Sequence, residues 1–180
     1  IFMSSGIFCQ TQKGNDIDGE YAGDWSGYSV SMPDANTIAT GAPFNGNNGV
    51  KSGNARIFSW NGSSWLAKGL SINGEASNDQ SACSVSMSDS NTIAIGAYIN
   101  TGINGALSGH ARVYKWLGGV WIQKGNDIDG EASNDQSGFC LDMADSNTLA
   151  IGAFSNYGNN GVASGHVRAY SWDGNVWTQK

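Results

Sequence analysis

The sequence is poor in charge, in histidine and in long apolar runs. Only 13% of its 180 residues are charged, 9 basic against 15 acidic, and the net charge is −6. Nucleic acids and anionic membranes both bind clustered lysine and arginine, so neither is expected as a partner. No apolar run approaches the roughly 18 residues of a membrane span, so we expect no membrane insertion. Two histidines, and no nucleophile that recurs beside a base, argue against an enzyme.

Cysteine is also scarce. Cys9, Cys83 and Cys140 are odd in number and occupy different positions relative to the internal repeat described below. This argues against a disulfide framework or a cysteine zinc site and predicts buried, inert thiols. No signal peptide is visible, but the chain begins at Ile1 rather than Met, so we expect a fragment of a longer protein.

What the sequence has in abundance is glycine and aromatic residues, arranged in a repeat. A unit of about 56 residues recurs three times, and such a period is typical of repeat architectures. Each unit opens with an acidic connector that reads GNDIDGE, GLSINGE and GNDIDGE at 14–20, 69–75 and 125–131. We therefore divide the chain into units 14–68, 69–124 and 125–180, after a segment 1–13 that is similar to the last strand of an earlier unit.

Each unit predicts four short strands. The first strands alternate apolar and polar residues in the first two units, and the second strands follow an Asp/Asn turn and end in Gly-Ala. An Asn/Gly loop then leads to the third strand, and a four-residue turn between two tryptophans leads to the fourth. Paired aromatics across such a hairpin contribute roughly 0.2–1 kcal/mol. The expected first strands are 28–32, 83–87 and 139–143, the second 37–42, 92–97 and 148–153, and the third 54–60, 110–116 and 166–172.

These strands predict an all-β fold of three β-propeller blades plus one strand of a fourth. A β-trefoil, which also has three four-stranded repeats, is the alternative. Propellers have four to eight blades, so three blades require either the remaining blades or self-association to close a ring. In a four-stranded meander, the tight turns share one face, whereas the Asn/Gly loops and connectors share the other. We expect a ligand on the second face.

Two short motifs of each unit carry a family resemblance. The first is Ser26–Val30, with Ser81–Val85 and Ser137–Leu141, and the second is Gly41–Pro43, with Gly96–Tyr98 and Gly152–Phe154. With the third strand after them, they resemble the FG-GAP repeat, the blade unit of integrin α-chain heads and of many extracellular proteins. The family's leading Phe is Ser in every copy here, and its calcium loop between the first two strands is reduced to a four-residue turn.

The resemblance implies a secreted or cell-surface location and a non-enzymatic binding or adhesion module. Such a module would recognise a protein or a glycan, and the fold alone does not determine which of the two is the ligand. The alternative is a purely structural spacer or assembly domain without a ligand of its own.

The connectors carry oxygen-bearing side chains at positions 1, 3, 5 and 9, a spacing by which tight loops wrap Ca²⁺. Calcium is therefore one hypothesis. The other is that the acidic groups face water while Ile17, Ile72 and Ile128 pack between neighbouring blades. The candidate ligands are Asp16, Asp18, Glu20 and Asp24 in the first connector, Ser71, Asn73, Glu75 and Asp79 in the second, and Asp127, Asp129, Glu131 and Asp135 in the third.

Three further sets of residues recur or carry a motif. Asn54, His110 and His166 share one repeat position, and we interpret the two histidines as structural hydrogen-bonding residues. The recurring arginines are expected to pair with a connector carboxylate or to stack on an aromatic neighbour; they are Arg56, Arg112 and Arg168. Asn61-Gly62-Ser63 forms an N-glycosylation sequon on an expected exposed turn.

Overall fold

The computed structural model describes residues 11–180, which form fourteen β-strands in three antiparallel sheets and contain no helix. The all-β prediction is confirmed. Without a helix, the described chain also lacks any helical segment that could cross a bilayer. The predicted strand of a preceding unit falls on residues 1–13, most of which lie outside the described part.

The first sheet contains β1 (Ser29–Asp34), β2 (Thr37–Ala42), β3 (Asn54–Trp60), β4 (Trp65–Ala67) and β5 (Ile72–Asn73). The second contains β6 (Ser84–Asp89), β7 (Thr92–Ala97), β8 (His110–Leu117), β9 (Val120–Gln123) and β10 (Ile128–Asp129). The third contains β11 (Ser137–Asp145), β12 (Thr148–Ala153), β13 (His166–Trp172) and β14 (Trp177–Gln179). Within residues 11–180, no sheet closes on itself.

The second strand of every repeat has the predicted bounds, whereas the first strand ends two residues later than predicted in every repeat. β1, β6 and β11 each end at an aspartate that the sequence assigned to the turn. In β1, the Asp34 carboxylate accepts a hydrogen bond from the Asn36 backbone N–H at 2.7 Å, and the other two repeats make the same contact. The aspartate therefore belongs to the strand and to the turn at once.

The connectors are not mere links between repeats. Ile72 and Asn73 form β5, which pairs with the start of β3 in the preceding sheet, and β10 pairs with β8 in the same way. The fourth strand of the first sheet is thus interrupted at residues 68–71, and β5 continues the pairing along the same edge of β3. In the second sheet, β9 and β10 pair with β8 in the same way. The unit boundary that the sequence predicts after residue 68 therefore falls between β4 and β5, which lie on the same edge of the first sheet.

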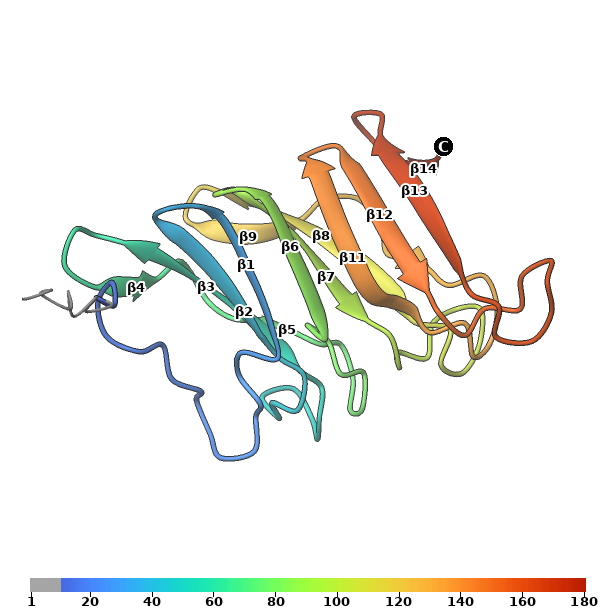
Figure 1. The fold of residues 1–180 in the computed structure, drawn as a ribbon, viewed down its shortest axis with the longest axis horizontal. Helices are drawn as coiled ribbons and strands as arrows, with labels where there is room; N and C mark the ends of the chain where they lie inside the picture. Colours follow the sequence, from blue (N-terminus) through green and yellow to red (C-terminus); the bar gives the residue numbers. More distant parts are fainter. Residues whose placement is uncertain (1–10) are drawn as a thin grey trace, which may run out of the picture.

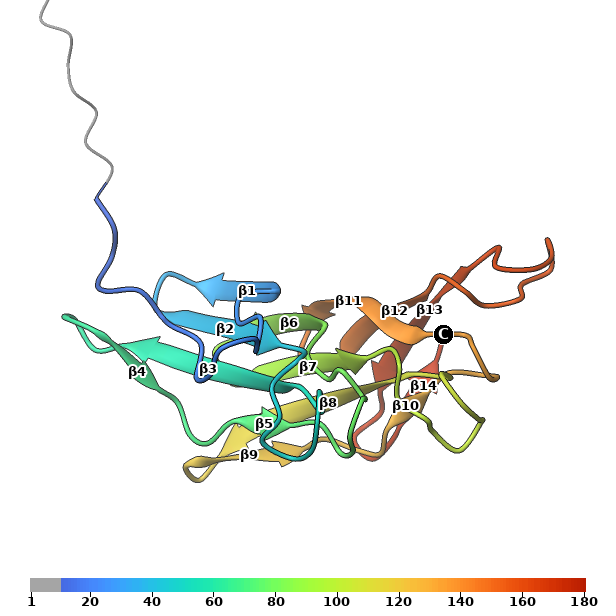
Figure 2. The ribbon, with the colours of Figure 1, turned by 90° about the horizontal axis from the view of Figure 1, so that it is seen from below.

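The three sheets stack face to face in chain order, as Figure 1 shows from left to right. Their first strands lie along one side of the stack and their fourth strands along the other (Figure 2). One apolar core lies between the first and second sheets and another between the second and third. Ile72 and Ile128 are buried in these two cores, which confirms that they pack between neighbouring sheets, whereas Ile17 is half-buried.

Serine hydroxyls form hydrogen bonds between each sheet and the next. Ser31 Oγ on β1 accepts a hydrogen bond from the Met87 backbone N–H at 2.9 Å. One repeat later, Ser86 Oγ accepts the equivalent bond from the Met143 N–H at 3.0 Å. The alternation of these first strands thus places a polar contact towards the following sheet and an apolar one towards the preceding sheet.

A lysine and a tryptophan pair form a second repeated contact between units. Lys68 donates to the Ser90 carbonyl and lies over the rings of Trp116 and Trp121, and the Trp121 indole N–H donates to the Lys68 carbonyl at 2.8 Å. The predicted cross-strand tryptophan pairs are confirmed, with ring centroids 5.2–5.4 Å apart. Lys13 and Lys124 make the same contacts in the other two repeats.

The two outer faces of the stack lack the cover that the inner faces have. Val85 on β6 is 7% exposed beneath the first sheet, whereas the equivalent Val30 on β1 is 64% exposed. At the other end, Val167 on β13 is 73% exposed, although its counterpart Ala111 is buried. Both ends of the stack therefore present side chains of the kind that the inner sheets bury.

The prediction of buried thiols holds for one of the two described cysteines. Cys83 is buried, and burial raises its pKa to about 12. Cys140 is exposed, because it lies on the outer face of the third sheet, which no further sheet covers within residues 11–180. Cys9 lies outside the described residues.

Candidate functional site

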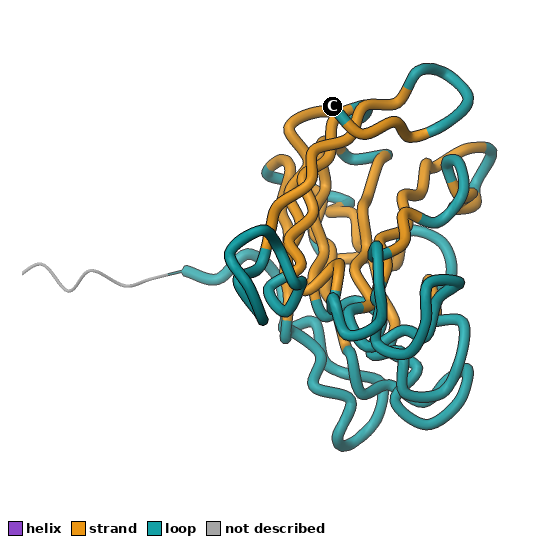
Figure 3. The backbone as a smooth tube through the Cα atoms, turned by 90° about the vertical axis from the view of Figure 1, so that its right-hand side faces the viewer, coloured by secondary structure: helices purple, strands orange, loops and turns teal. Residues whose placement is uncertain are grey.

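The long loops and the connectors meet at one end of the strands, as predicted, and Figure 3 shows the loops gathered there. Asn48 in the first loop donates from its side-chain amide to the Gly74 carbonyl at 2.8 Å, and Asn104 donates to the Gly130 carbonyl at 2.7 Å. Backbone bonds add to this, among them Asn78 N–H to the Val50 carbonyl at 2.8 Å. The second and third connectors are therefore held by the loop of the preceding repeat.

The acidic positions of a connector have separate structural partners. The aspartate at position 9 is buried and caps its own turn: Asp135 accepts from the Glu131 and Ala132 backbone N–H groups at 2.9 and 2.8 Å. Asp24 and Asp79 cap the equivalent turns. The position-1 carboxylates Asp16 and Asp127 accept from a glutamine four residues earlier, in both cases at 2.7 Å.

Positions 3 and 5 contact the third strand of the same repeat. At position 3, the backbone carbonyls of Asp18, Asn73 and Asp129 accept a hydrogen bond from the arginine on the third strand of the same repeat. At position 5, Glu20 accepts from Asn54 at 2.9 Å, whereas Glu75 and Glu131 approach an arginine and a histidine. One connector thus directs its carboxylates to several different places.

All three arginines behave as predicted, because each pairs with a connector carboxylate or stacks on an aromatic neighbour. Arg112 Nη1 lies 3.4 Å from Glu75 Oε1, and Arg168 Nη1 lies 3.9 Å from Glu131 Oε1. Each guanidinium also lies over the aromatic ring two residues later, at 5.4–5.6 Å from the centroid. Arg56 bonds to the Asp18 carbonyl and the Ser26 hydroxyl instead.

The structure brings together residues of two different connectors around His110. This histidine begins β8, is 1% exposed, and directs Nδ1 towards Asp127 Oδ2 at 3.5 Å and Glu75 Oε2 at 3.9 Å. Burial, and then the Arg112 charge, lower the pKa of His110 to about 4, so the imidazole is neutral at pH 7 and these contacts are not ion pairs. Its Nε2 is buried without a hydrogen-bond partner.

The carboxylates close to His110 have raised pKa values. Burial raises the pKa of Glu75; Arg112 lowers it, and Asp127, Asp79 and Asp129 raise it further. Burial and the neighbouring Asp127 also raise the pKa of Asp129. Negative charges from two connectors therefore repel one another around a single arginine and a neutral histidine.

The sequence interpretation treated the two histidines as isolated structural residues and so missed this cluster. Glu75 and Asp127 are more than fifty residues apart, and the 1-3-5-9 spacing groups residues only within one connector. The predicted strand order could have revealed the cluster. In a four-stranded meander, the start of the third strand lies between the connector before it and the connector after it.

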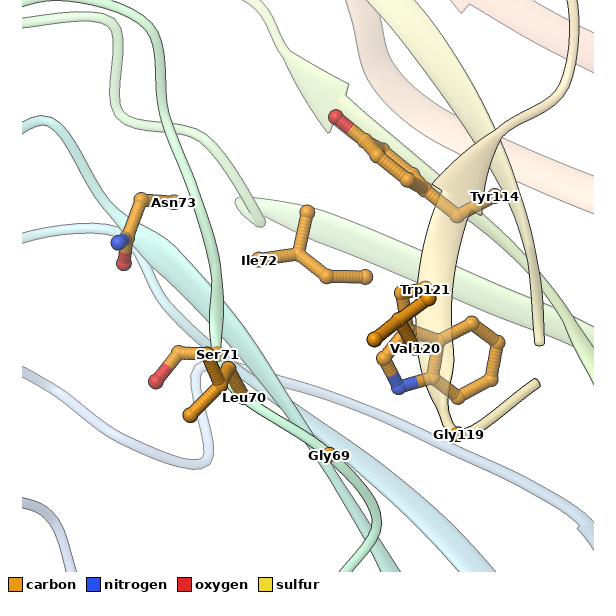
Figure 4. Close-up of a pocket in the computed structure, with 9 residues that line it drawn as sticks. All are labelled: Gly69, Leu70, Ser71, Ile72, Asn73, Tyr114, Gly119, Val120 and Trp121. Atoms are coloured by element: carbon orange, nitrogen blue, oxygen red, sulfur yellow. The ribbon is translucent and has the colours of Figure 1, made fainter. Parts of the chain in front are cut away.

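Each connector also borders a recess lined by aromatic rings. The largest, with a volume of about 440 Å³, lies between connector residues 69–73 and the side chains of Tyr114, Val120 and Trp121 (Figure 4). Equivalent recesses of about 360 and 320 Å³ lie beside connector residues 126–129 and 15–18. Their aromatic walls are Tyr170 with Trp177 and Phe58 with Trp65.

The recesses differ in charge. The outer two present an asparagine and two aspartates at their rims, from the GNDIDGE connectors. The middle one presents Leu70, Ser71 and Asn73 at the same positions and has no carboxylate among its lining residues. Leu70 is 89% exposed at its rim. Only the middle recess therefore combines aromatic walls with a neutral polar rim.

The sequon residue Asn61 is exposed in the turn between β3 and β4. Its side-chain oxygen accepts hydrogen bonds from the backbone N–H groups of Ser63 and Ser64 at 2.9 and 2.8 Å.

No model of a known protein family matches this chain, and no curated protein matches it either.

Proposed function

We propose that the three sheets are consecutive blades of a β-propeller of FG-GAP type. Three observations support this: the sheets are separate, they stack in chain order, and the same serine contacts join each to the next. A β-trefoil would instead pair strands of different repeats in a common barrel. The exposed Val30 and Val167 at the two ends are the positions that further blades, or a second copy, would cover.

The function that this arrangement supports best is glycan recognition by a non-enzymatic module at the cell surface or in the secreted fraction. The observation that carries the proposal is the recess that recurs beside every connector with a tryptophan and a second aromatic ring in its wall. Aromatic faces pack against the apolar face of a sugar ring, and a few amide or hydroxyl groups fix its orientation.

The middle recess is the primary site in this proposal. Its rim offers the Ser71 hydroxyl and the Asn73 amide, which suit a neutral sugar, and carries no charge that binding would have to desolvate. Repetition of a weak site along a rigid stack would raise the affinity for a branched or polymeric glycan by multivalency. The location outside the cell follows from the FG-GAP resemblance and belongs to the same proposal.

The test is binding of the 180-residue chain to an array of neutral and acidic glycans at high surface density. We expect a subset of neutral glycans to be retained, and Leu70→Glu to weaken that binding about tenfold or more by placing a carboxylate at the rim. Leu117→Glu is the matched control, since Leu117 is also exposed but lies outside the recess. Absence of glycan binding, or equal loss in both variants, would contradict the proposal and favour a structural spacer.

A further inference from the structure

Three donor atoms converge at the start of β8 from three separate segments of the chain. They are His110 Nδ1, Glu75 Oε2 and Asp127 Oδ2, all within 4.8 Å of one another. The histidine is almost fully buried and its Nε2 has no hydrogen-bond partner, although buried imidazoles are normally hydrogen-bonded. Nδ1 is the nitrogen that faces the two carboxylates, and at 3.5 and 3.9 Å it is too far from either for a good hydrogen bond, so the ring is directed between the two acidic groups.

The distances are close to those of a metal site. Ligands at about 2.1 Å from a tetrahedral zinc ion lie about 3.4 Å from each other. The Nδ1–Oδ2 and Nδ1–Oε2 distances are 3.5 and 3.9 Å, and the three donor atoms lie within 4.8 Å of one another, so ligation requires side-chain movements of about an ångström or less.

The second oxygen of each carboxylate already has a partner. Arg112 Nη1 lies 3.4 Å from Glu75 Oε1, and the Gln123 amide donates to Asp127 Oδ1 at 2.7 Å. These contacts leave Oε2 and Oδ2 directed at His110. Outer partners of this kind orient the ligands of protein metal sites.

We propose that Glu75, His110 and Asp127 bind a first-row divalent transition-metal ion, with Zn²⁺ as the representative probe. The imidazole ligand decides the class, because Ca²⁺ and Mg²⁺ take oxygen ligands whereas Zn²⁺ and its neighbours accept mixed nitrogen and oxygen sets. The ion would also neutralise the repulsion between the two carboxylates.

The first repeat provides an internal control for this site. Asn54 stands where the second repeat has His110, and it donates a 2.9 Å hydrogen bond to Glu20. Ser71 stands where the following connector has Asp127. The first repeat thus keeps the position-5 glutamate and lacks the other two ligands. In the third repeat, His166 Nδ1 lies 3.7 Å from Glu131, and the position equivalent to Asp127 would lie beyond residue 180.

The experiment is a calorimetric titration of the untagged 180-residue chain with ZnCl₂ after removal of metals by a chelator. We expect one Zn²⁺ per chain, and visible absorption bands of bound Co²⁺ that are typical of nitrogen and oxygen ligands. His110→Asn and Asp127→Ser, which install the residues of the first repeat, are expected to lower the affinity at least tenfold. Asp16→Ser is the matched control and is expected to bind as the unaltered chain does.

Thermal unfolding of each variant in chelator separates loss of the site from loss of the fold. Uptake of no Zn²⁺ by the folded chain would overturn the proposal. So would unchanged affinity in folded His110→Asn and Asp127→Ser, or displacement of Zn²⁺ by an equal concentration of Ca²⁺. None of these readouts depends on a glycan, so this proposal and the proposed function can fail independently.

Discussion

The first and second repeats follow the same backbone course around the start of the third strand but place different side chains there. β3 begins with Asn54, which hydrogen-bonds Glu20, whereas β8 begins with His110, which faces Glu75 and Asp127. In the first repeat the position-5 glutamate thus completes a structural hydrogen bond. In the second, the same glutamate becomes one of three potential metal ligands. The comparison teaches that the fold fixes where the side chains of the third strand and the connectors lie. A few substitutions per repeat then determine what these side chains can bind.

The two repeats also differ in what covers them. The second sheet lies between two neighbours, while the first has a neighbour on one face only within the described chain. Equivalent residues therefore experience different surroundings, and matched substitutions in the two repeats measure what a neighbouring sheet contributes.

The largest difference is expected for alanine at two equivalent glycines, Gly74 and Gly19. A Cβ at Gly74 would overlap the Ser52 carbonyl oxygen, whereas a Cβ at Gly19 would meet nothing closer than Ser26 Cβ at 3.3 Å. Neither glycine has a positive φ, so steric overlap alone separates them. We expect Gly74→Ala to cost about 3 kcal/mol and Gly19→Ala to leave stability nearly unchanged. Urea unfolding of both variants measures this, and equal costs would contradict the packing of the connector on the preceding loop.

A smaller difference is expected for the paired valines on the first strands. Val85→Ala removes methyl groups from the core between two sheets and should cost about 2 kcal/mol. Val30→Ala removes them from an exposed face and should cost less than about 0.5 kcal/mol. If denaturant midpoints show a comparable loss for Val30→Ala, then that face is covered in solution by a second copy, which light scattering would detect.

The smallest effect on stability is expected in a comparison of the two described cysteines by chemical labelling, because the fold stays intact. Cys83 lies beneath the neighbouring sheet with its pKa raised to about 12, so its thiol stays protonated at pH 8. Cys140 lies on the uncovered face of the third sheet. We expect iodoacetamide to modify Cys140 and to spare Cys83 in the folded chain, as read by peptide mass mapping. Modification of Cys83 at a similar rate would show that the sheets separate readily.

Much of the fold could be predicted because it depends on local patterns. The Gly-Ala end of each second strand and the tryptophan pairs around each hairpin marked their strands correctly. The edge strands β5 and β10 were missed because a strand of two residues is too short to have a strand pattern of its own. They are held by pairing with Ala55 and Ala111, residues distant in sequence.

The candidate site could be predicted only in part. Glu75 and Asp127 were recognised as candidate metal ligands, but their spacing suggested partners within each connector. Their contact with His110 depends on how the connectors pass on either side of β8, which the sequence does not specify locally. The aromatic recesses have the same origin, since each joins a connector to a ring from the next hairpin.

The most direct test of the comparison is to build the second repeat's ligand set into the first. Asn54→His together with Ser71→Asp gives the first repeat a histidine, an aspartate and its own Glu20 at the equivalent positions. Zn²⁺ titration of this double variant should show two ions per chain, where the unaltered chain binds one. A stoichiometry that stays at one, in a variant that melts as the unaltered chain does, would contradict the claim that the repeats share one frame and differ only in side-chain chemistry.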